Sequence, residues 1–264
     1  MYDRYNREIT YLRVSVTDRC NLRCSYCTPP GGFEAMPRRD ILSFERITEI
    51  VRVAAGMGIR KVRLTGGEPL VRRGIVELVG MLAAVPGLET LAMTTNGILL
   101  PRYARQLRAA GLQAVNISLD TIDPAGYREI TGGGRLADAV AGVDAAVAAG
   151  FEPIKVNAVV PDAARDLTAL GVFCAERGVI LQRIGLYHLA HKNPDSTAVD
   201  RPPKCEICNR LRLTADGKLK PCLHSNHEFP VHSGNVEEAV RAAVAAKPPR
   251  AQACTNRAMV SIGG

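Results

Sequence analysis

YLRVSVTDRCNLRCSYC, residues 11–27, joins an apolar run directly to a polar segment that contains three cysteines. The run YLRVSV (11–16) is rich in β-branched and aromatic residues, and it predicts a strand. Cys20, Cys24 and Cys27 follow it in the spacing C-x3-C-x2-C. Barrel and open-sheet enzymes hold their ligands at the carboxyl ends of parallel strands. The stretch therefore predicts a first strand and the edge of the sheet that carries the site.

The order of strand and helix repeats up to about Leu189. Further predicted strands are KVRLTG (61–66), ETLAMTTN (89–96), AVNISLD (114–120), PIKVNAVV (153–160) and VILQRIGLY (179–187). Predicted helices are FERITEIVRVAAGMG (44–58), IVELVGMLAAV (75–85), RYARQLRAAG (102–111), LADAVAGVDAAVAAG (136–150) and DLTALGVFCAERG (166–178). Such alternation predicts an α/β fold with a parallel sheet. Periodicity alone does not choose between an open doubly wound sheet and part of a barrel, because both satisfy it.

Composition argues against several classes of protein. The chain has 264 residues, enough to bury a substantial core, and a formal net charge of +8. It lacks the run of about 18 apolar residues that predicts a membrane-spanning helix, and its first residues do not resemble a signal peptide. We therefore expect a cytoplasmic protein without a membrane partner. Positive charge favours anionic partners, but Lys and Arg are spread without interleaved aromatics, so we expect no nucleic-acid partner.

The cysteines indicate metal chemistry. Eight cysteines in a cytoplasmic protein favour metal binding or redox chemistry over disulfides, because cytosolic thiols stay reduced. No His lies near CNLRCSYC (20–27) to complete a tetrahedral zinc site. Three thiolates suit a [4Fe-4S] cluster in which one iron has no cysteine ligand and can bind a small molecule. The spacing favours such a cluster, with zinc as the alternative.

The pattern changes after residue 189. HKNPDSTAVDRPPKCEIC (191–208) gathers Pro, Asp, Ser and Asn without periodicity, which is typical of a boundary. We therefore predict one domain over residues 1–189 and a C-terminal extension over residues 190–264. Within CEICNRLRLTADGKLKPC (205–222), ADGK predicts a hairpin turn between two short strands. NVEEAVRAAVAA (235–246) predicts a helix.

CNLRCSYC followed by TGGEP (65–69) resembles the radical S-adenosylmethionine (SAM) superfamily. The resemblance implies a partial (β/α)6 TIM-type barrel with a C-terminal iron-sulfur extension. It implies that Cys20, Cys24 and Cys27 hold a [4Fe-4S] cluster whose open iron binds SAM. Cleavage of SAM would then give a deoxyadenosyl radical that abstracts hydrogen from the substrate. The glycines of TGGEP would present backbone to SAM, where a side chain would block close approach.

CEICNRLRLTADGKLKPC (205–222) resembles the second cluster motif of the GTP 3',8-cyclase family, which begins molybdenum cofactor biosynthesis. The resemblance implies that Cys205, Cys208 and Cys222 hold a second [4Fe-4S] cluster with an iron left for guanine. The alternative is a zinc ribbon whose fourth ligand comes from His224, His227 or Cys254. VNISLDTID, YREITG, PIKVNAVV and the final IGG also match the family.

Residue roles follow from the matching motifs. The residues implied for SAM are Tyr26, Gly66, Gly67, Glu68, Thr94, Ser118, Lys155 and Asn157. Those implied for GTP are Arg13, Lys61, Arg63, Arg183, Arg210 and Arg212. Arg210 and Arg212 are also expected to be catalytic, and the terminal Gly263 and Gly264 to help after hydrogen abstraction. Strand geometry supports Lys61 with Arg63 and Arg210 with Arg212, because residues i and i+2 share one face, and Arg183 is a further candidate.

The sequence departs from the family in two places. LAHKNPDSTAVDRPPK (189–204) replaces a longer segment, and Leu186 and His188 stand where the family has an acidic residue and a methionine. His188 is either a SAM contact or an ordinary, partly buried histidine. These departures leave open another substrate, a peptide or a different nucleotide, and a metal-binding regulatory module without catalysis. Besides GTP, the expected partners are an external low-potential electron donor and a second copy in a homodimer.

Overall fold

The computed structural model describes residues 1–29, 31–160, 166–186, 189, 200, 204–231 and 234–263. Its strands form one sheet in the order β6-β5-β4-β3-β2-β1-β7-β8-β9. The first six strands are parallel, and each pairs with the next along the chain. They are β1 (Tyr11–Ser15), β2 (Lys61–Thr65), β3 (Thr90–Thr95), β4 (Ala114–Ser118), β5 (Ile154–Val160) and β6 (Ile180–Gly185).

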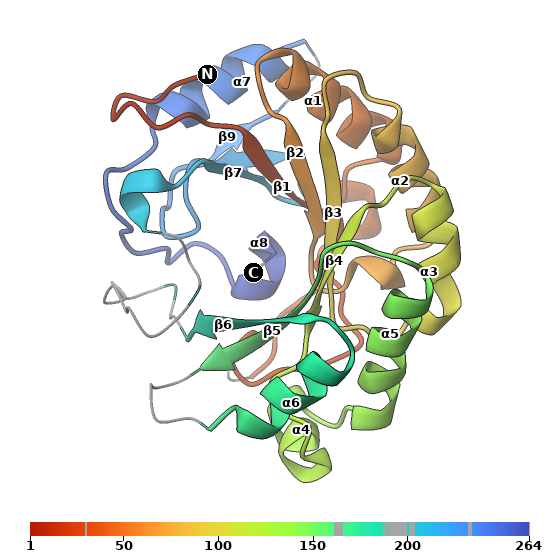
Figure 1. The fold of residues 1–264 in the computed structure, drawn as a ribbon. Helices are drawn as coiled ribbons and strands as arrows, with labels where there is room; N and C mark the ends of the chain where they lie inside the picture. The colour runs from red at the N-terminus through yellow and green to blue at the C-terminus, as the bar shows by residue number, and fades with distance from the viewer. Residues whose placement is uncertain are drawn as a thin grey trace.

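The helices between these strands cover the convex face of the curved sheet (Figure 1). They are α1 (Phe44–Gly56), α2 (Ile75–Ala83), α3 (Leu100–Ala109), α4 (Pro124–Thr131), α5 (Leu136–Ala148) and α6 (Thr168–Glu176). Short 3-10 turns span Arg38–Asp40, Pro69–Val71 and Cys205–Ile207. A doubly wound sheet reverses its strand order at a switch point, and these six strands do not. The partial barrel is therefore confirmed.

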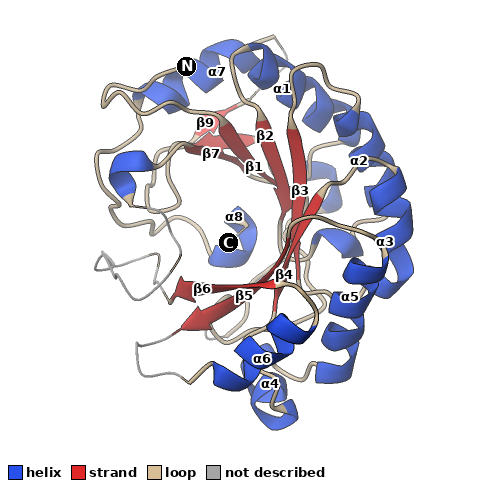
Figure 2. Cartoon of the chain, viewed as in Figure 1, coloured by secondary structure: helices blue, strands red, loops and turns tan. Residues whose placement is uncertain are grey.

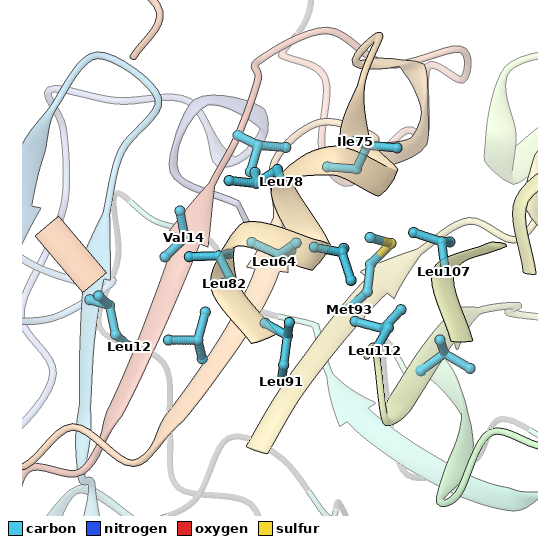
Figure 3. Packing of buried hydrophobic residues seen from close by; sticks show 14 of the residues in the cluster. Leu12, Val14, Leu64, Ile75, Leu78, Leu82, Leu91, Met93, Leu107 and Leu112 are labelled. Atoms are coloured by element: carbon cyan, nitrogen blue, oxygen red, sulfur yellow. The ribbon is translucent and has the colours of Figure 1, made fainter. Parts of the chain in front are cut away.

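The core lies between the sheet and this outer layer of helices (Figure 3). Leu12 and Val14 of β1 and Leu64 of β2 are fully buried there, against Leu78 and Leu82 of α2. Burying such a side chain contributes roughly 1.5–3 kcal/mol. Because strand residues alternate between faces, this apolar set turns the intervening residues toward the concave interior.

The C-terminal strands extend the same sheet. β7 (Arg210–Leu213) pairs in parallel with β1, on the side away from β2. β8 (Lys218–Lys220) returns antiparallel to β7, which confirms the predicted hairpin, and β9 (Phe229–Pro230) follows. The sheet thus runs through both parts of the chain, and the division between residues 189 and 190 stays a prediction.

Two helices lie at the C-terminal end of the chain. α7 (Val236–Ala245), which the sequence predicts, packs beside α1 on the outside. α8 (Met259–Ile262) lies within the concave side of the sheet (Figure 2). In the part of the chain that the structure describes, no helix is long and apolar enough to cross a membrane.

Candidate active site

A cavity lies on the concave side of the sheet and extends from the carboxyl ends of the parallel strands to the first residues of β1 and β2, Tyr11 and Lys61. The first cysteine set, Cys20, Cys24 and Cys27, lines this cavity together with residues of every strand from β1 to β7. Met259 and Val260 of α8 close part of it. The second set, Cys205, Cys208 and Cys222, does not line this cavity.

Helix α4 holds the first cysteine loop. The backbone N–H of Arg23 donates to the carbonyl of Thr131 at 3.0 Å, and that of Ser25 to Ile130 at 2.9 Å. These bonds flank Cys24 on both sides. Asp123 caps the helix by accepting from the N–H of Gly126 at 2.7 Å, with Pro124 at its first position. The Asp-Pro pair was therefore a usable start signal for this helix, which the sequence analysis missed.

The three thiols of this loop lie close together in a buried setting. Burial raises the pKa of Cys24 to about 12, and the negative charges of Asp120 and Cys20 add to it. Burial, with Cys24 and Cys20 nearby, likewise raises the pKa of Cys27 to about 12. The pKa of Cys20 is also raised, mainly by burial. A bound cation reverses this effect, because a coordinating thiol loses its proton outright.

This thiol set fits an iron-sulfur cluster. All three cysteines are free and half-buried, and they face the cavity together. Among the described residues, no group of three His, Cys, Asp or Glu side chains could hold a single metal ion. A [4Fe-4S] cluster does not require such convergence, since each thiolate binds a different iron of the cluster.

The TGGEP loop is built against the cysteine loop. The N–H of Gly67 donates to the carbonyl of Thr17 at 2.7 Å, and the N–H of Glu68 to that of Arg19 at 2.8 Å. A Cβ on Gly67 would lie 2.4 Å from the carbonyl oxygen of Arg19, and one on Gly66 2.4 Å from that of Thr17. Both glycines are therefore required by the close approach of two backbone segments, although both also line the cavity.

We expect Gly67→Ala to destabilise the protein by about 1–3 kcal/mol, because the new methyl group would push the two loops apart. The cysteine loop would shift, so iron incorporation should fall as well. Thermal unfolding and iron content measure the two effects. Gly80→Ala is the matched control: no heavy atom lies within 4 Å of its Cβ position in α2. That change should stabilise the helix slightly, and an equally stable Gly67→Ala protein would contradict the packing argument.

Glu68 has a structural task in this loop. Its carboxylate is buried and accepts from the Thr95 hydroxyl at 2.7 Å, the Asn96 N–H at 2.7 Å and the Leu70 N–H at 3.0 Å. Burial raises its pKa to about 7, although these bonds oppose the shift. The side chain thus ties the end of β2 to the end of β3. Asn96, which the sequence analysis missed, extends the link by donating to Asn21 at 2.7 Å.

Cationic side chains form two rows across three neighbouring strands. The strand register aligns Arg13 of β1 with Arg63 of β2 and Arg212 of β7. The row before it aligns Lys61, Tyr11 and Arg210. All six residues line the cavity, so the five basic residues of these rows share the predicted interior face, whereas Arg183 does not.

Tyr11 lies among these cations. Its hydroxyl accepts from Arg63 Nε at 2.8 Å, and Lys61 and Arg210 lie over its ring at 5.4 and 5.5 Å from the centroid. Burial alone would raise the pKa of Tyr11. The guanidinium groups of Arg63, Arg13 and Arg210 outweigh that effect and lower the pKa to about 7. The sequence analysis missed this residue, although Tyr11 precedes Arg13 by two positions and shares its face.

We expect the stability of the protein to depend on pH through Tyr11. Because its pKa is about 7 when folded and about 10 when unfolded, folding favours the phenolate, and the gain grows as pH rises from 7 to 10. The gain is absent below pH 7. Chemical unfolding of wild type and Tyr11→Phe across this range measures it as a difference in slope, and parallel pH profiles would contradict it.

The described part of the C-terminal tail reaches the end of β2. The Arg212 guanidinium donates to the carbonyl of Gly263, which has φ +76°. A Cβ on Gly263 would lie 2.5 Å from Thr65 Cγ2 and 3.2 Å from the N of Gly66. Glycine is therefore required at this position, beside the TGGEP loop. Gly264 and His188 lie outside the described residues.

The expected SAM contacts are only partly brought together. Tyr26, Thr94, Ser118 and Asn157 line the cavity. The Tyr26 hydroxyl donates to Asp120 at 2.8 Å, which joins the cysteine loop to β4. Lys155, by contrast, is half-buried on β5 and is not among the lining residues.

The expectation for Arg183 is wrong. Its side chain is exposed and pairs with Asp200 at 3.3 Å, and it does not line the cavity. The register pairs Asn157 of β5 with Gln182, so Gln182 faces the interior and Arg183 the other side. Gln182 donates to Asn157 at 3.2 Å and takes the interior position that the sequence analysis assigned to Arg183.

The second cysteine set lies at the open end of the β7–β8 hairpin, away from its turn. Cys205 and Cys208 precede β7, and Cys222 follows β8. Although burial opposes it, nearby Lys247 and Arg210 lower the pKa of Cys208, whereas burial raises the pKa of Cys222. Of the alternative zinc ligands, His227 is exposed, and Cys254 is buried with its thiol 3.3 Å from Asn256 Oδ1.

Comparison with known proteins gives the family. A model of the radical SAM superfamily matches residues 14–162. The GTP 3',8-cyclase of Alkaliphilus oremlandii (strain OhILAs) is 39% identical to the chain, and the alignment covers 100% of both proteins. The GTP 3',8-cyclase of Moorella thermoacetica (strain ATCC 39073 / JCM 9320) is 40% identical, also over 100% of both. The chain belongs to the GTP 3',8-cyclase family of the radical SAM superfamily.

Solved structures of other radical SAM proteins share the fold. Streptococcus suis SuiB bound to the precursor peptide SuiA has a TM-score of 0.67 at 16% identity, covering 92% of this chain and 66% of that one. Native anSMEcpe with bound AdoMet has a TM-score of 0.65 at 14% identity, covering 91% and 81%. At such identity the likeness shows the partial barrel alone. Family membership makes the chain an enzyme whose cofactors are SAM and [4Fe-4S] clusters.

Proposed function

We propose that this enzyme converts GTP to (8S)-3',8-cyclo-7,8-dihydroguanosine 5'-triphosphate in molybdenum cofactor biosynthesis. The observation that carries the proposal is the double row of cations inside a cavity that the first cysteine set lines. Family membership supports the same reaction. When bound, SAM and its cluster would supply the deoxyadenosyl radical that takes the 3' hydrogen of the ribose. C3' would then bond to C8 of guanine as the C8–N7 double bond becomes single, and N7 would take up one further electron and a proton.

The residues divide between the two cysteine sets, of which only the first lines the cavity. We assign the first cluster to Cys20, Cys24 and Cys27. SAM would lie beside it, against Gly66, Gly67, Tyr26, Thr94, Ser118 and Asn157, which all line the cavity. The second cluster is assigned to Cys205, Cys208 and Cys222, next to the start of β7. GTP would lie between them, with its ribose toward SAM and its base toward the second cluster.

The basic rows suit the triphosphate. Guanidinium groups make forked, charge-assisted bonds to phosphate oxygens. Arg63 is already oriented, because its Nη1 donates to Asn116 Oδ1 at 2.6 Å and to the Met93 carbonyl at 3.1 Å. Arg13 and Lys61 flank it on the same face. Such prior orientation lowers the entropic cost of binding.

Arg212 and the C-terminal tail act together in this proposal. The bond from Arg212 to Gly263 holds the tail beside the TGGEP loop, within reach of the ribose. We assign Arg210, Arg212, Gly263 and Gly264 to the step that follows hydrogen abstraction. Arg210 and Arg212 also line the cavity, so they contact GTP directly in this arrangement.

The reconstituted enzyme, SAM and a reductant should give the cyclic nucleotide from GTP and not from ATP, CTP or UTP. Product analysis by mass spectrometry is the test. Deoxyadenosine formation without any cyclised GTP would move the substrate to another class, such as a peptide or a different nucleotide. Absence of both iron and SAM cleavage would contradict the proposal.

Arg63→Met should weaken binding of GTP at least about tenfold, a loss of about 1.4 kcal/mol, and binding of SAM far less. Titration calorimetry with each ligand measures the two affinities. Arg183→Met is the matched control, because that guanidinium is exposed and points away from the cavity. Equal losses for both ligands in Arg63→Met would indicate a damaged fold and contradict a triphosphate site.

Three further expectations accompany the proposal. The enzyme would receive electrons from an external low-potential donor, because reductive cleavage of SAM consumes an electron. It would work in the cytoplasm, where thiols stay reduced. A homodimer stays a prediction.

A further inference from the structure

Lys247 is buried beside the second cysteine set. Only 1% of its surface is exposed, which is rare for a lysine. Its Nζ donates to Cys208 Sγ at 3.5 Å, to the Arg210 carbonyl at 2.8 Å and to the Pro221 carbonyl at 3.1 Å. An ammonium has three N–H donors, so all three are used. The buried group is therefore fully satisfied, and one of its partners is a proposed cluster ligand.

These contacts join the two arms that carry the cysteines. Arg210 lies two residues after Cys208, whereas Pro221 immediately precedes Cys222. The ammonium thus bridges the start of β7 and the segment that follows β8. Without it, the Arg210 and Pro221 carbonyls would each lose a hydrogen-bond donor, and an unsatisfied buried carbonyl is destabilising.

The segment after Lys247 contacts the set as well. The N–H of Ala251 donates to Cys205 Sγ at 3.4 Å. Arg7 holds this segment in place, since its Nη2 donates to the Pro248 carbonyl at 2.8 Å and its Nη1 to the Cys205 carbonyl at 2.7 Å. Residues 247–251 thus supply donors to two of the three thiols.

We propose that Lys247 is a positioning residue for the second cluster, and that its buried charge raises the reduction potential of that cluster. The inference rests on the proposed assignment of Cys205, Cys208 and Cys222. Hydrogen bonds to sulfur and net charge nearby are among the factors that set cluster potentials. A fixed positive charge stabilises the reduced cluster, which carries one more negative charge. Water does not screen the interaction, because the ammonium is buried.

A redox titration followed by electron paramagnetic resonance tests this in the Cys24→Ala background, where only the second cluster remains. Lys247→Gln keeps a donor and removes the charge, and we expect a more negative potential. Lys247→Arg keeps the charge, so the second cluster should have a potential close to the one it has with Lys247. Lys218→Gln is the control: it removes one positive charge from β8, but that ammonium is partly exposed and already paired with Asp216 and Glu228 at 3.5 Å.

The outcomes separate this inference from the proposed function. An unchanged potential in Lys247→Gln, with its cluster intact, overturns the role of the charge. Loss of the second cluster's iron in Lys247→Gln, with recovery in Lys247→Arg, supports the inference, because only a cation then keeps the ligands in place. If Cys208→Ala loses no iron relative to wild type, the cluster assignment itself is wrong, whatever Lys247 does.

Discussion

Cys24→Ala is expected to abolish reductive cleavage of SAM while the second cluster stays in place. Cys24 is the middle cysteine of the loop that α4 holds through the flanking N–H groups of Arg23 and Ser25. Alanine keeps that backbone but removes a thiolate, and two cysteines cannot retain the cluster. Iron should fall from about eight to about four per chain, since each cluster contains four.

Deoxyadenosine formation with dithionite and SAM measures the loss, and iron analysis shows that one cluster survives. Cys174→Ala is the matched control, because that thiol is buried in α6 and does not line the cavity. It should keep both clusters and full activity. Undiminished deoxyadenosine production by Cys24→Ala would refute the assigned radical site.

Cys208→Ala should separate the two functions of the enzyme. Cys208 lies outside the cavity that the first cysteine set lines, and it precedes β7, whose Arg210 and Arg212 reach into that cavity. Loss of the second cluster should therefore weaken GTP binding at least about tenfold and abolish cyclisation. The first cluster should still cleave SAM slowly when reduced, because none of its ligands is touched.

Iron content, GTP affinity and deoxyadenosine formation are best measured side by side in this variant. Again the Cys174→Ala protein serves as control. Unchanged GTP affinity after loss of one cluster would refute a guanine-binding role for the second cluster. Tightly bound zinc in the parent protein would refute the second iron-sulfur cluster. It would favour the zinc alternative, in which His224, His227 or Cys254 is the fourth ligand.

Local sequence was sufficient to predict the strands and to predict most of the residues that face the interior. Apolar β-branched runs marked β1 to β6, and alternation placed Arg13, Lys61 and Arg63 on one side. Arg183 was a candidate without this support, and alternation by itself gives two faces without showing which one faces the interior. The pairing of Gln182 with Asn157 shows that Gln182 faces the interior. Such a strand register depends on contact between segments that are distant in the sequence, so local sequence does not give it.

Features that depend on distant contacts could not be predicted. The chain returns after some two hundred residues to place β7 beside β1, and no local pattern encodes that neighbour. The close approach that requires the glycines of TGGEP comes from Thr17 and Arg19 in another loop, and their role toward SAM stays a prediction. Lys247 stands before two prolines in an unremarkable stretch, and only the fold brings it to Cys208.

The place of β1 between β2 and β7 has a consequence for synthesis of the protein. The first strand leaves the ribosome early, but its second neighbour ends at Leu213 and follows much later. Until then one side of β1 is an open row of backbone donors and acceptors, which invites pairing with other chains. Nascent chains that stop before β7 should therefore aggregate or bind chaperones, and release into the soluble fraction should begin only once the β7–β8 hairpin has emerged.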